Sequence, residues 1–103
     1  MGMILYNITF TVATDIEDDF VTWMKADHIP AIFATGMFFD HKFYRLMNST
    51  ADGFTNYSIQ FFAESTAKLI EYENRFANAL RYETQARYGE KALAFRSLLE
   101  AVV

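Results

Sequence analysis

The sequence contains no cysteine, which excludes disulfides, thiolate metal sites and cysteine nucleophiles together. Its four glycines are scattered, and neither a glycine-rich phosphate-binding motif nor Gly-x-Ser-x-Gly occurs. Nucleotide binding through such motifs and serine hydrolysis are therefore poor hypotheses. The two histidines lack the spacing of a His-x-His or His-Glu-x-x-His metal site. We expect no metal and no cofactor; a lone axial His28 or His41 would be compatible with haem, but nothing in the sequence requires one.

Positive charge is also scarce: the chain has 9 Lys and Arg residues and 13 Asp and Glu residues, which gives a net charge of −4. Such a chain repels the phosphate backbone, so we do not expect nucleic acid as a partner. Long apolar runs are missing too: the longest, residues 31–39, contains Thr35 and Gly36 and is far too short to cross a membrane. No basic and then apolar leader opens the chain, and a cytoplasmic location is the resulting expectation.

Apolar bulk, by contrast, is abundant. Of the 103 residues 52% are hydrophobic, with 11 Phe, 6 Tyr and 1 Trp. This length corresponds to one domain, which we expect to cover residues 1–103. A monomer of this size does not easily bury so much apolar surface. The composition therefore predicts either a lined cavity or a surface that a partner covers.

Hydrophobic periodicity predicts four strands and two helices. The strands are expected at residues 3–12, 37–47, 54–63 and 91–103, with an Asp-Gly turn between the middle two. The first helix is expected to begin at Asp15 and to end near His28, because Pro30 would break its hydrogen bonds and leave a short extra turn. The second is expected from residue 65 or 66 to near Gly89. This βαββαβ order predicts an α+β, ferredoxin-like fold: a four-stranded antiparallel sheet with both helices on one face.

The second face of that sheet carries a mixture of apolar and uncharged polar residues. The first strand presents Leu5, Asn7, Thr9 and Thr11 there, and the third presents Asn56, Ser58, Gln60 and Phe62. Such a mixture is typical of a ligand cavity or of a moist interface between two sheets. An ordinary polar face open to solvent is the alternative.

The segment Trp23-Met24-Lys25-Ala26-Asp27-His28-Ile29-Pro30 resembles the Trp-x-x-x-(acid)-His-x-Pro signature of the dimeric α+β barrel superfamily. Together with segments 3–7, 34–38 and 94–100, it makes the whole chain similar to a bacterial family of comparable length that is described as a domain of unknown function. In the superfamily, two sheets face each other across a two-fold axis and enclose a cavity. The resemblance implies a homodimer through the sheet face, with a pocket in each half.

Members of that superfamily include cofactor-independent monooxygenases, degradative enzymes, haem proteins and stress-related proteins. A shared fold transfers none of these chemistries. His28 is the candidate catalytic residue, since a neutral imidazole exchanges protons near neutral pH and Asp27 or another carboxylate could orient it. Its place before Pro30 predicts a rim position; a helix-capping histidine is the alternative. Tyr6, Tyr44 and Tyr57 are all eligible partners, and the sequence does not choose among them.

The remaining candidates are ligand-binding residues: Asn7, Trp23, His41, Arg45, Ser58, Gln60 and Arg96. His41 and Arg45 share one strand face and would bring a base and an anion-binding fork to a cavity wall, if they are not simply at an exposed edge. Asn7, Ser58 and Gln60 would supply neutral hydrogen bonds. Trp23 lies roughly 140° from His28 on an α-helix, which favours a core position.

Arginines in the second half of the chain have less specific interpretations. Arg96 would bind a ligand carboxylate or pair with Glu64, Glu83 or Glu100. In the second helix, Arg75, Arg81 and Arg87 interleave with glutamates, which predicts a solvated face with i,i+4 pairs.

Three functional hypotheses follow. The first is a homodimer that binds a small apolar or aromatic molecule in a partly polar, aromatic-lined cavity. The second is a cofactor-independent monooxygenase or isomerase with His28 as base. The third is a structural or interaction dimer without a pocket. Whether the chain is an enzyme stays open at this point.

Overall fold

A computed structural model describes residues 3–48 and 51–102 of the chain. The strands are β1 (Ile4–Ala13), β2 (Asp40–Arg45), β3 (Phe54–Ala63) and β4 (Ala92–Glu100). The α-helices are α1 (Glu17–Trp23), α2 (Ile29–Phe33), α3 (Thr66–Arg75) and α4 (Ala77–Tyr88). A π-helical turn η2 (Met24–His28) joins α1 to α2, and 3₁₀ turns η1 (Thr14–Ile16) and η3 (Gly89–Lys91) flank α1 and β4.

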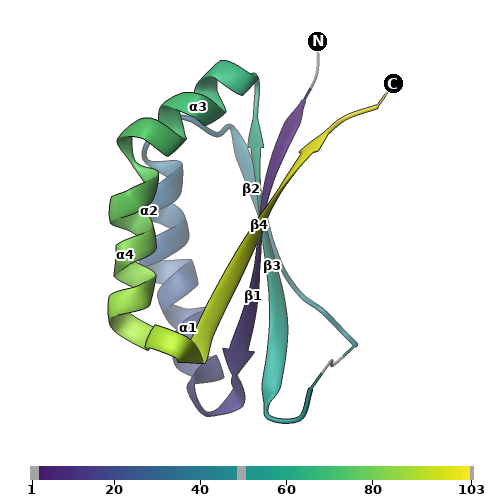
Figure 1. Cartoon of the computed structure of the whole chain (residues 1–103), viewed down its shortest axis with the longest axis vertical. Coiled ribbons are helices and arrows are strands. Elements are labelled where there is room, and N and C mark those ends of the chain that lie inside the picture. Colours follow the sequence, from purple (N-terminus) through teal and green to yellow (C-terminus); the bar gives the residue numbers. More distant parts are fainter. Residues whose placement is uncertain (1–2, 49–50, 103) are drawn as a thin grey trace.

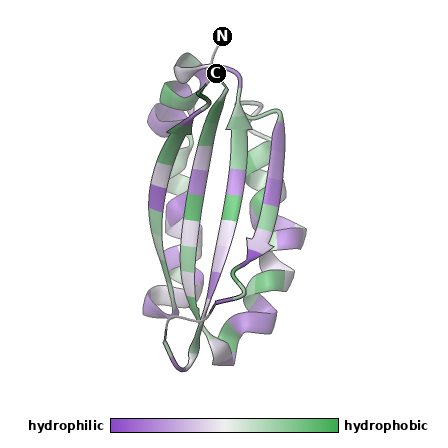
Figure 2. Ribbon diagram, turned by 90° about the vertical axis from the view of Figure 1, so that its right-hand side faces the viewer, coloured by the Kyte–Doolittle hydropathy of each residue, from purple (hydrophilic) through white to green (hydrophobic). Residues whose placement is uncertain are grey.

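The four strands form one antiparallel sheet in the order β2-β3-β1-β4. All helices cover one face of this sheet (Figure 1) and leave the other face open to the viewer in Figure 2. The predicted α+β, ferredoxin-like class is therefore confirmed. None of the helices in the described part of the chain is long and apolar enough to span a membrane.

The core lies between the sheet and the helices, and burial alternates with a period of two along β1 and along β3 from Tyr57 onward. Tyr6, Ile8, Phe10 and Val12 of β1 are at most 3% exposed, and β3 contributes alternate residues from Tyr57 to Ala63. The helical layer supplies large buried side chains to the same cluster: Phe20, Met24, Ile29, Ile32, Leu69 and Tyr72. Each such side chain contributes about 1.5–3 kcal/mol through burial.

The first helical segment does not end near His28 as expected. Pro30 lies in the first turn of α2, where the missing N–H of proline costs little. The turn before it is wider than an α-helix, and the Ile29 N–H donates to the Met24 carbonyl five residues back. The proline is therefore accommodated, and residues five apart, such as Trp23 and His28, come to the same side.

The second helical segment is two helices rather than one. The backbone at Phe76 has φ −124° and ψ −31°, which ends α3 and lets α4 begin at a different angle (Figure 1). Ser65 is the cap, and its hydroxyl accepts from the Lys68 N–H at 3.3 Å. Strands β2 and β4 are shorter than expected, and residues 49–50 of the predicted turn lie outside the described residues.

Candidate functional site

A polar cluster lies between the helical layer and the sheet, centred on the hydroxyl of Tyr6. This oxygen accepts a hydrogen bond from Arg81 Nη2 at 2.9 Å and another from Arg96 Nε at 3.1 Å. Arg81 comes from α4, while Arg96 comes from β4. Two guanidinium groups from facing layers thus converge on one buried oxygen, although like charges repel.

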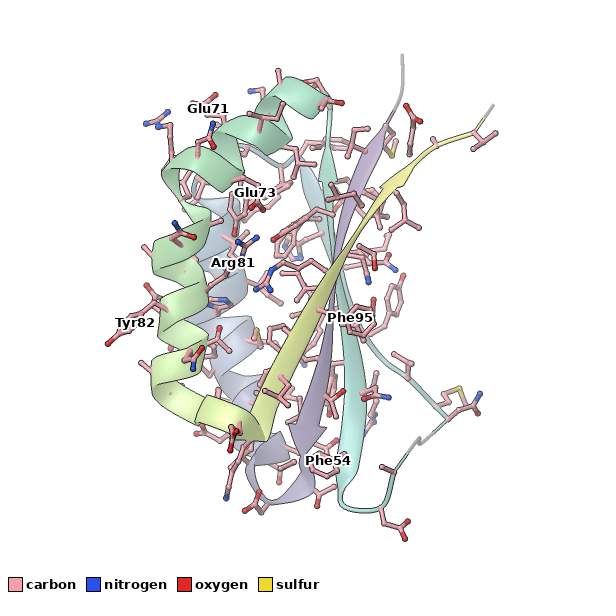
Figure 3. The ribbon with its side chains drawn as sticks, in the orientation of Figure 1. Phe54, Glu71, Glu73, Arg81, Tyr82 and Phe95 are labelled. Carbon is pink, nitrogen blue, oxygen red and sulfur yellow. The ribbon has the colours of Figure 1, made fainter. Side chains whose placement is uncertain are left out.

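Strand alternation and helix spacing explain how these side chains meet. Tyr6 is a core-facing residue of β1, and Arg96 stands opposite Ile8 in the β1–β4 register, so it points to the same side. Arg81 follows the buried Leu80 on α4. Figure 3 shows Arg81 between the helices and the sheet, beside Glu73.

The charges of the two arginines are not equally compensated. Glu73 accepts from Arg81 Nη2 with both carboxylate oxygens, at 2.9 and 2.7 Å. Within residues 3–48 and 51–102, Arg96 has no carboxylate within ion-pair distance, and it donates a hydrogen bond to Tyr6. Arg81 Nε is buried without a hydrogen-bond partner in the same residues. The cluster therefore has more donors than acceptors.

His28 lies next to this cluster and is 4% exposed, so the expected rim position is wrong. The wide turn η2 places its ring against Trp23, with centroids 4.5 Å apart and planes 20° from parallel. Its Nε2 lies 3.2 Å from Thr84 Oγ1. Nδ1 has no hydrogen-bond partner among the described residues, and the carboxylate facing it is Glu83, at 3.8 Å, rather than Asp27.

Burial and then the positive charge of Arg96 lower the pKa of His28 to about 4. The imidazole is therefore neutral at pH 7, which removes the cationic helix-capping alternative. A neutral ring can accept a proton or a hydrogen bond, and Thr84 connects it to the space between α4 and β4.

That space is a cleft of about 290 Å³ between α4, η3 and β4. Arg81, Arg96 and Thr84 line one part of it, and Phe10, Ala92 and Ala94 supply apolar wall. Gln85 and Glu90 line it near the start of β4. In the described part of the chain, no group of three or more His, Asp or Glu side chains is arranged to hold a metal ion.

Residues 3–102 match the family described as a domain of unknown function, DUF4286. The chain belongs to this family. No curated protein matches it significantly. A solved structure of an ethyl tert-butyl ether D (EthD) family protein from Bacillus halodurans is similar, with 14% identity, a TM-score of 0.72, and 96% of this chain and 99% of that chain covered.

A second solved structure, of a dimeric ferredoxin-like protein from an uncultured marine organism, is also similar to this DUF4286 chain. The identity is 12%, the TM-score is 0.65, and 100% of this chain and 98% of that chain are covered. At such identities these likenesses establish the fold of the DUF4286 chain. They do not extend to its chemistry.

The structure does not bring the sequence-predicted site residues of this DUF4286 chain together in one place. Arg96, His28 and Trp23 belong to the layer between sheet and helices. Asn7, Ser58 and Gln60 share the uncovered face, where Ser58 donates to Asn7 Oδ1 at 2.6 Å and Asn7 Nδ2 donates to Thr9 at 3.0 Å. Arg96 binds Tyr6, and the expected pairs with Glu64, Glu83 or Glu100 are not formed.

His41 and Arg45 lie on the helix-covered side of the edge strand β2, and they line different hollows. Arg45 borders a groove of about 430 Å³ with Glu17, and its Nη1 is 3.9 Å from that carboxylate. His41 packs edge-on against Phe33, with centroids 5.1 Å apart, beside a separate groove of about 400 Å³. The structure does not bring either residue to His28.

Sequence reasoning missed Arg81 and Thr84. Arg75 does pair with Glu71 at i,i+4, but Arg81 reaches back to Glu73 and inward to Tyr6, so the prediction of a solvated face is wrong for it. The apolar stripe of this segment reaches Leu80 and, continued by four, meets the buried Thr84. A polar residue at that stripe position is the signal that could have found the site.

Proposed function

We propose that this protein is a small-molecule-binding homodimer whose ligand occupies the cleft between α4 and β4 of each protomer. The observation that carries the proposal is the convergence of Arg81 and Arg96 on the Tyr6 hydroxyl at the side of this cleft. A buried polar group without a partner, such as Arg81 Nε, costs about 1–3 kcal/mol unless something compensates it. A polar ligand in the adjoining cleft supplies such compensation.

The position of this cleft differs from the cavity expected from the sequence. The expected cavity lay on the uncovered sheet face, where Asn7 and Ser58 instead satisfy each other. On the covered side, Arg81 Nε is buried without a hydrogen-bond partner among the described residues, and Arg81 lines the cleft together with Phe10. The ligand site is therefore proposed on the covered side, and the uncovered face is proposed as the dimer interface.

Support for the dimer comes from apolar side chains on the uncovered face. Leu93, Phe95 and Leu99 of β4 are 58%, 61% and 49% exposed there, and Tyr44 of β2 is 50% exposed. Figure 3 shows Phe95 pointing away from the helices. Exposed apolar groups of this size usually mark an interaction surface, and a similar solved structure is described as dimeric.

The direct test is a screen of small neutral and charged molecules against the ¹⁵N-labelled protein. We expect binders to shift the backbone signals of Thr84, Gln85 and Ala94, and to lose affinity when Arg81 is replaced by Met. Lys42→Gln, on the uncovered face, is the matched control and should bind normally. Sedimentation equilibrium of the same sample should report a dimer. A monomer, or a panel that never shifts the cleft signals, would contradict the corresponding half of the proposal.

A second candidate function is proton transfer with His28 as base, as in a cofactor-independent monooxygenase or isomerase. The observation that favours it is the neutral imidazole joined to the cleft through Thr84. Removal of a substrate proton by this ring would leave a carbanion that the nearby guanidinium groups stabilise. Under this function, His28→Gln retains ligand binding and loses exchange of a ligand C–H proton with deuterated solvent. Under the binding function no such exchange occurs in the parent protein.

A further inference from the structure

We infer that the ligand of the α4–β4 cleft is a small organic monoanion, a carboxylate or an enolate, whose charged oxygens bind the guanidinium groups of Arg96 and Arg81. The inference rests on the proposed site and names the chemistry of its occupant. It follows from the hydrogen-bond capacity of the cluster and from the position of the nearby carboxylates.

The cluster is rich in donors and poor in acceptors. Tyr6 already accepts two hydrogen bonds, which uses both lone pairs of its hydroxyl. Both oxygens of Glu73 bind Arg81 Nη2. Arg96 reaches Tyr6 through Nε, and its two terminal nitrogens have no protein hydrogen-bond partner among residues 3–48 and 51–102. Arg96 is exposed, so water can solvate these nitrogens, and a ligand that displaces the water must supply acceptors. An anion is the acceptor that a guanidinium group binds best.

Tyr6 acts here as a positioning residue. Its hydroxyl is held in a buried side chain, and it fixes both arginines from the sheet side. Holding two cations near one point is unfavourable in an empty site, but it preorganises the site for an anion. Because Arg96 is exposed, a ligand can reach its guanidinium group from solvent.

The other residues that line the cleft indicate the polarity and the charge of the rest of the ligand. Phe10, Ala92 and Ala94 provide apolar wall, so the body of the ligand is expected to be apolar. Arg96 lies four residues beyond Ala92 on β4, about 13 Å along an extended strand. Glu90, near the opposite end, disfavours a second negative charge. A monoanion fits this distribution, whereas a dianion does not.

His28 provides an internal reporter of the bound charge. Burial is the first cause of its lowered pKa and Arg96 is the second, so an anion on Arg96 should raise the pKa of the imidazole. The other charged groups near the ring are Glu83 on α4, at 3.8 Å, and Arg87, whose guanidinium lies 5.4 Å from the Trp23 ring centroid. Neither is part of the proposed anion contact.

The test compares benzoate with benzamide, which have similar size and shape but differ in charge. By titration of ¹⁵N-labelled protein, we expect benzoate to bind about tenfold more tightly than benzamide. Benzoate should shift the Arg96 Nε–H signal and raise the pKa of His28, measured from its ring resonances. Arg96→Gln should abolish both the preference and the pKa response. Arg75→Gln, at an exposed arginine paired with Glu71 on α3, should change neither.

Arg96→Lys is the second variant, in case the glutamine protein does not fold. It keeps the charge but removes the planar fork, so the preference for benzoate should be reduced. Equal binding of benzoate and benzamide in the cleft would overturn the anion inference while the proposed site stands. The same holds if only neutral molecules bind there. If no compound shifts the cleft signals, the site and the inference fail together.

Discussion

The polar side chains on the two faces of the sheet differ in how fully their hydrogen-bonding groups are paired within the protein. On the uncovered face, Ser58 donates to Asn7, and Asn7 donates to Thr9, so these groups satisfy one another. On the covered face, Arg96 has no carboxylate partner in the described part of the chain, and His28 Nδ1 has no hydrogen-bond partner there. Both faces are polar, so polarity alone does not distinguish the proposed ligand site from the uncovered face. Unmet hydrogen-bond capacity beside a cleft is the more informative property.

The apolar groups show the opposite distribution. Most of those on the covered face, such as Tyr6, Ile8 and Phe10 of β1, are buried in the core, while Leu93, Phe95 and Leu99 are exposed on the uncovered face. Under the proposed function, a polar ligand binds on the covered side and a second copy covers the apolar groups of the other face. Four experiments test whether the two faces differ in this way.

The largest effect is expected from Tyr6→Ala. The side chain is 2% exposed and stacks on Phe38, so its removal leaves a cavity and frees two guanidinium groups. We expect the free energy of unfolding to fall by about 3–5 kcal/mol, measured by urea denaturation. Thr9→Ala on the uncovered face is the control and should cost less than about 1 kcal/mol. Equal losses of unfolding free energy in Tyr6→Ala and Thr9→Ala would contradict the difference between the two faces.

The next effect concerns pH. The pKa of His28 is lowered from 6.5 to about 4 in the folded protein, so the unfolded chain binds the proton first. Its contribution to stability is present above pH 6.5 and is lost as the pH falls toward 4, by up to about 3 kcal/mol. In His28→Gln this part of the pH dependence should vanish when unfolding is measured between pH 7 and pH 4. Parallel curves for the two proteins would contradict the buried neutral histidine.

A smaller effect is expected from Phe95→Asp. A charge at this exposed position of the uncovered face should weaken a sheet-to-sheet dimer by about 2 kcal/mol, about thirtyfold in dissociation constant. Sedimentation velocity over a concentration series measures this change. Tyr82→Asp, at an exposed residue of α4, should leave association unaltered. If Tyr82→Asp dissociates the dimer and Phe95→Asp does not, the interface lies on the helical side.

The smallest effect is expected from Ser58→Ala. It removes one partly buried hydrogen bond from the uncovered face, and Asn7 keeps its bond to Thr9. We expect a loss of about 0.5–1.5 kcal/mol in unfolding free energy and no change in affinity for a ligand of the cleft. A large loss of that affinity would return the ligand site to the uncovered face.

Much of the fold could be predicted because its signals are local. Alternation in residues 54–63 predicts β3 with the bounds that the structure has, and the Trp23–Pro30 segment carries the family resemblance. The exceptions depend on backbone geometry. Pro30 is accommodated by the wide turn η2, and the break at Phe76 has neither proline nor glycine to announce it. Such features depend on packing rather than on residue preference.

The candidate site was predictable only in part. His28 and Arg96 were candidates from their chemistry alone, and the structure places both in the covered layer. Arg81 was assigned to a solvated face because its neighbours in sequence are charged. His41 and Arg45 were expected at a cavity wall, and they line separate grooves instead. Residue type indicates what a side chain can do, whereas its neighbours in space decide whether it does so.

The order of the elements, the core-facing residues of β1 and β3, and the excess of apolar residues could all be read from the sequence. These follow from periodicity and composition, which are properties of short segments. The tertiary structure decided that Tyr6 meets Arg81 and Arg96, which are 75 and 90 residues away along the chain. The reason is physical: the β1–β4 register and the angle of α4 set these distances, and both result from the packing of the whole core.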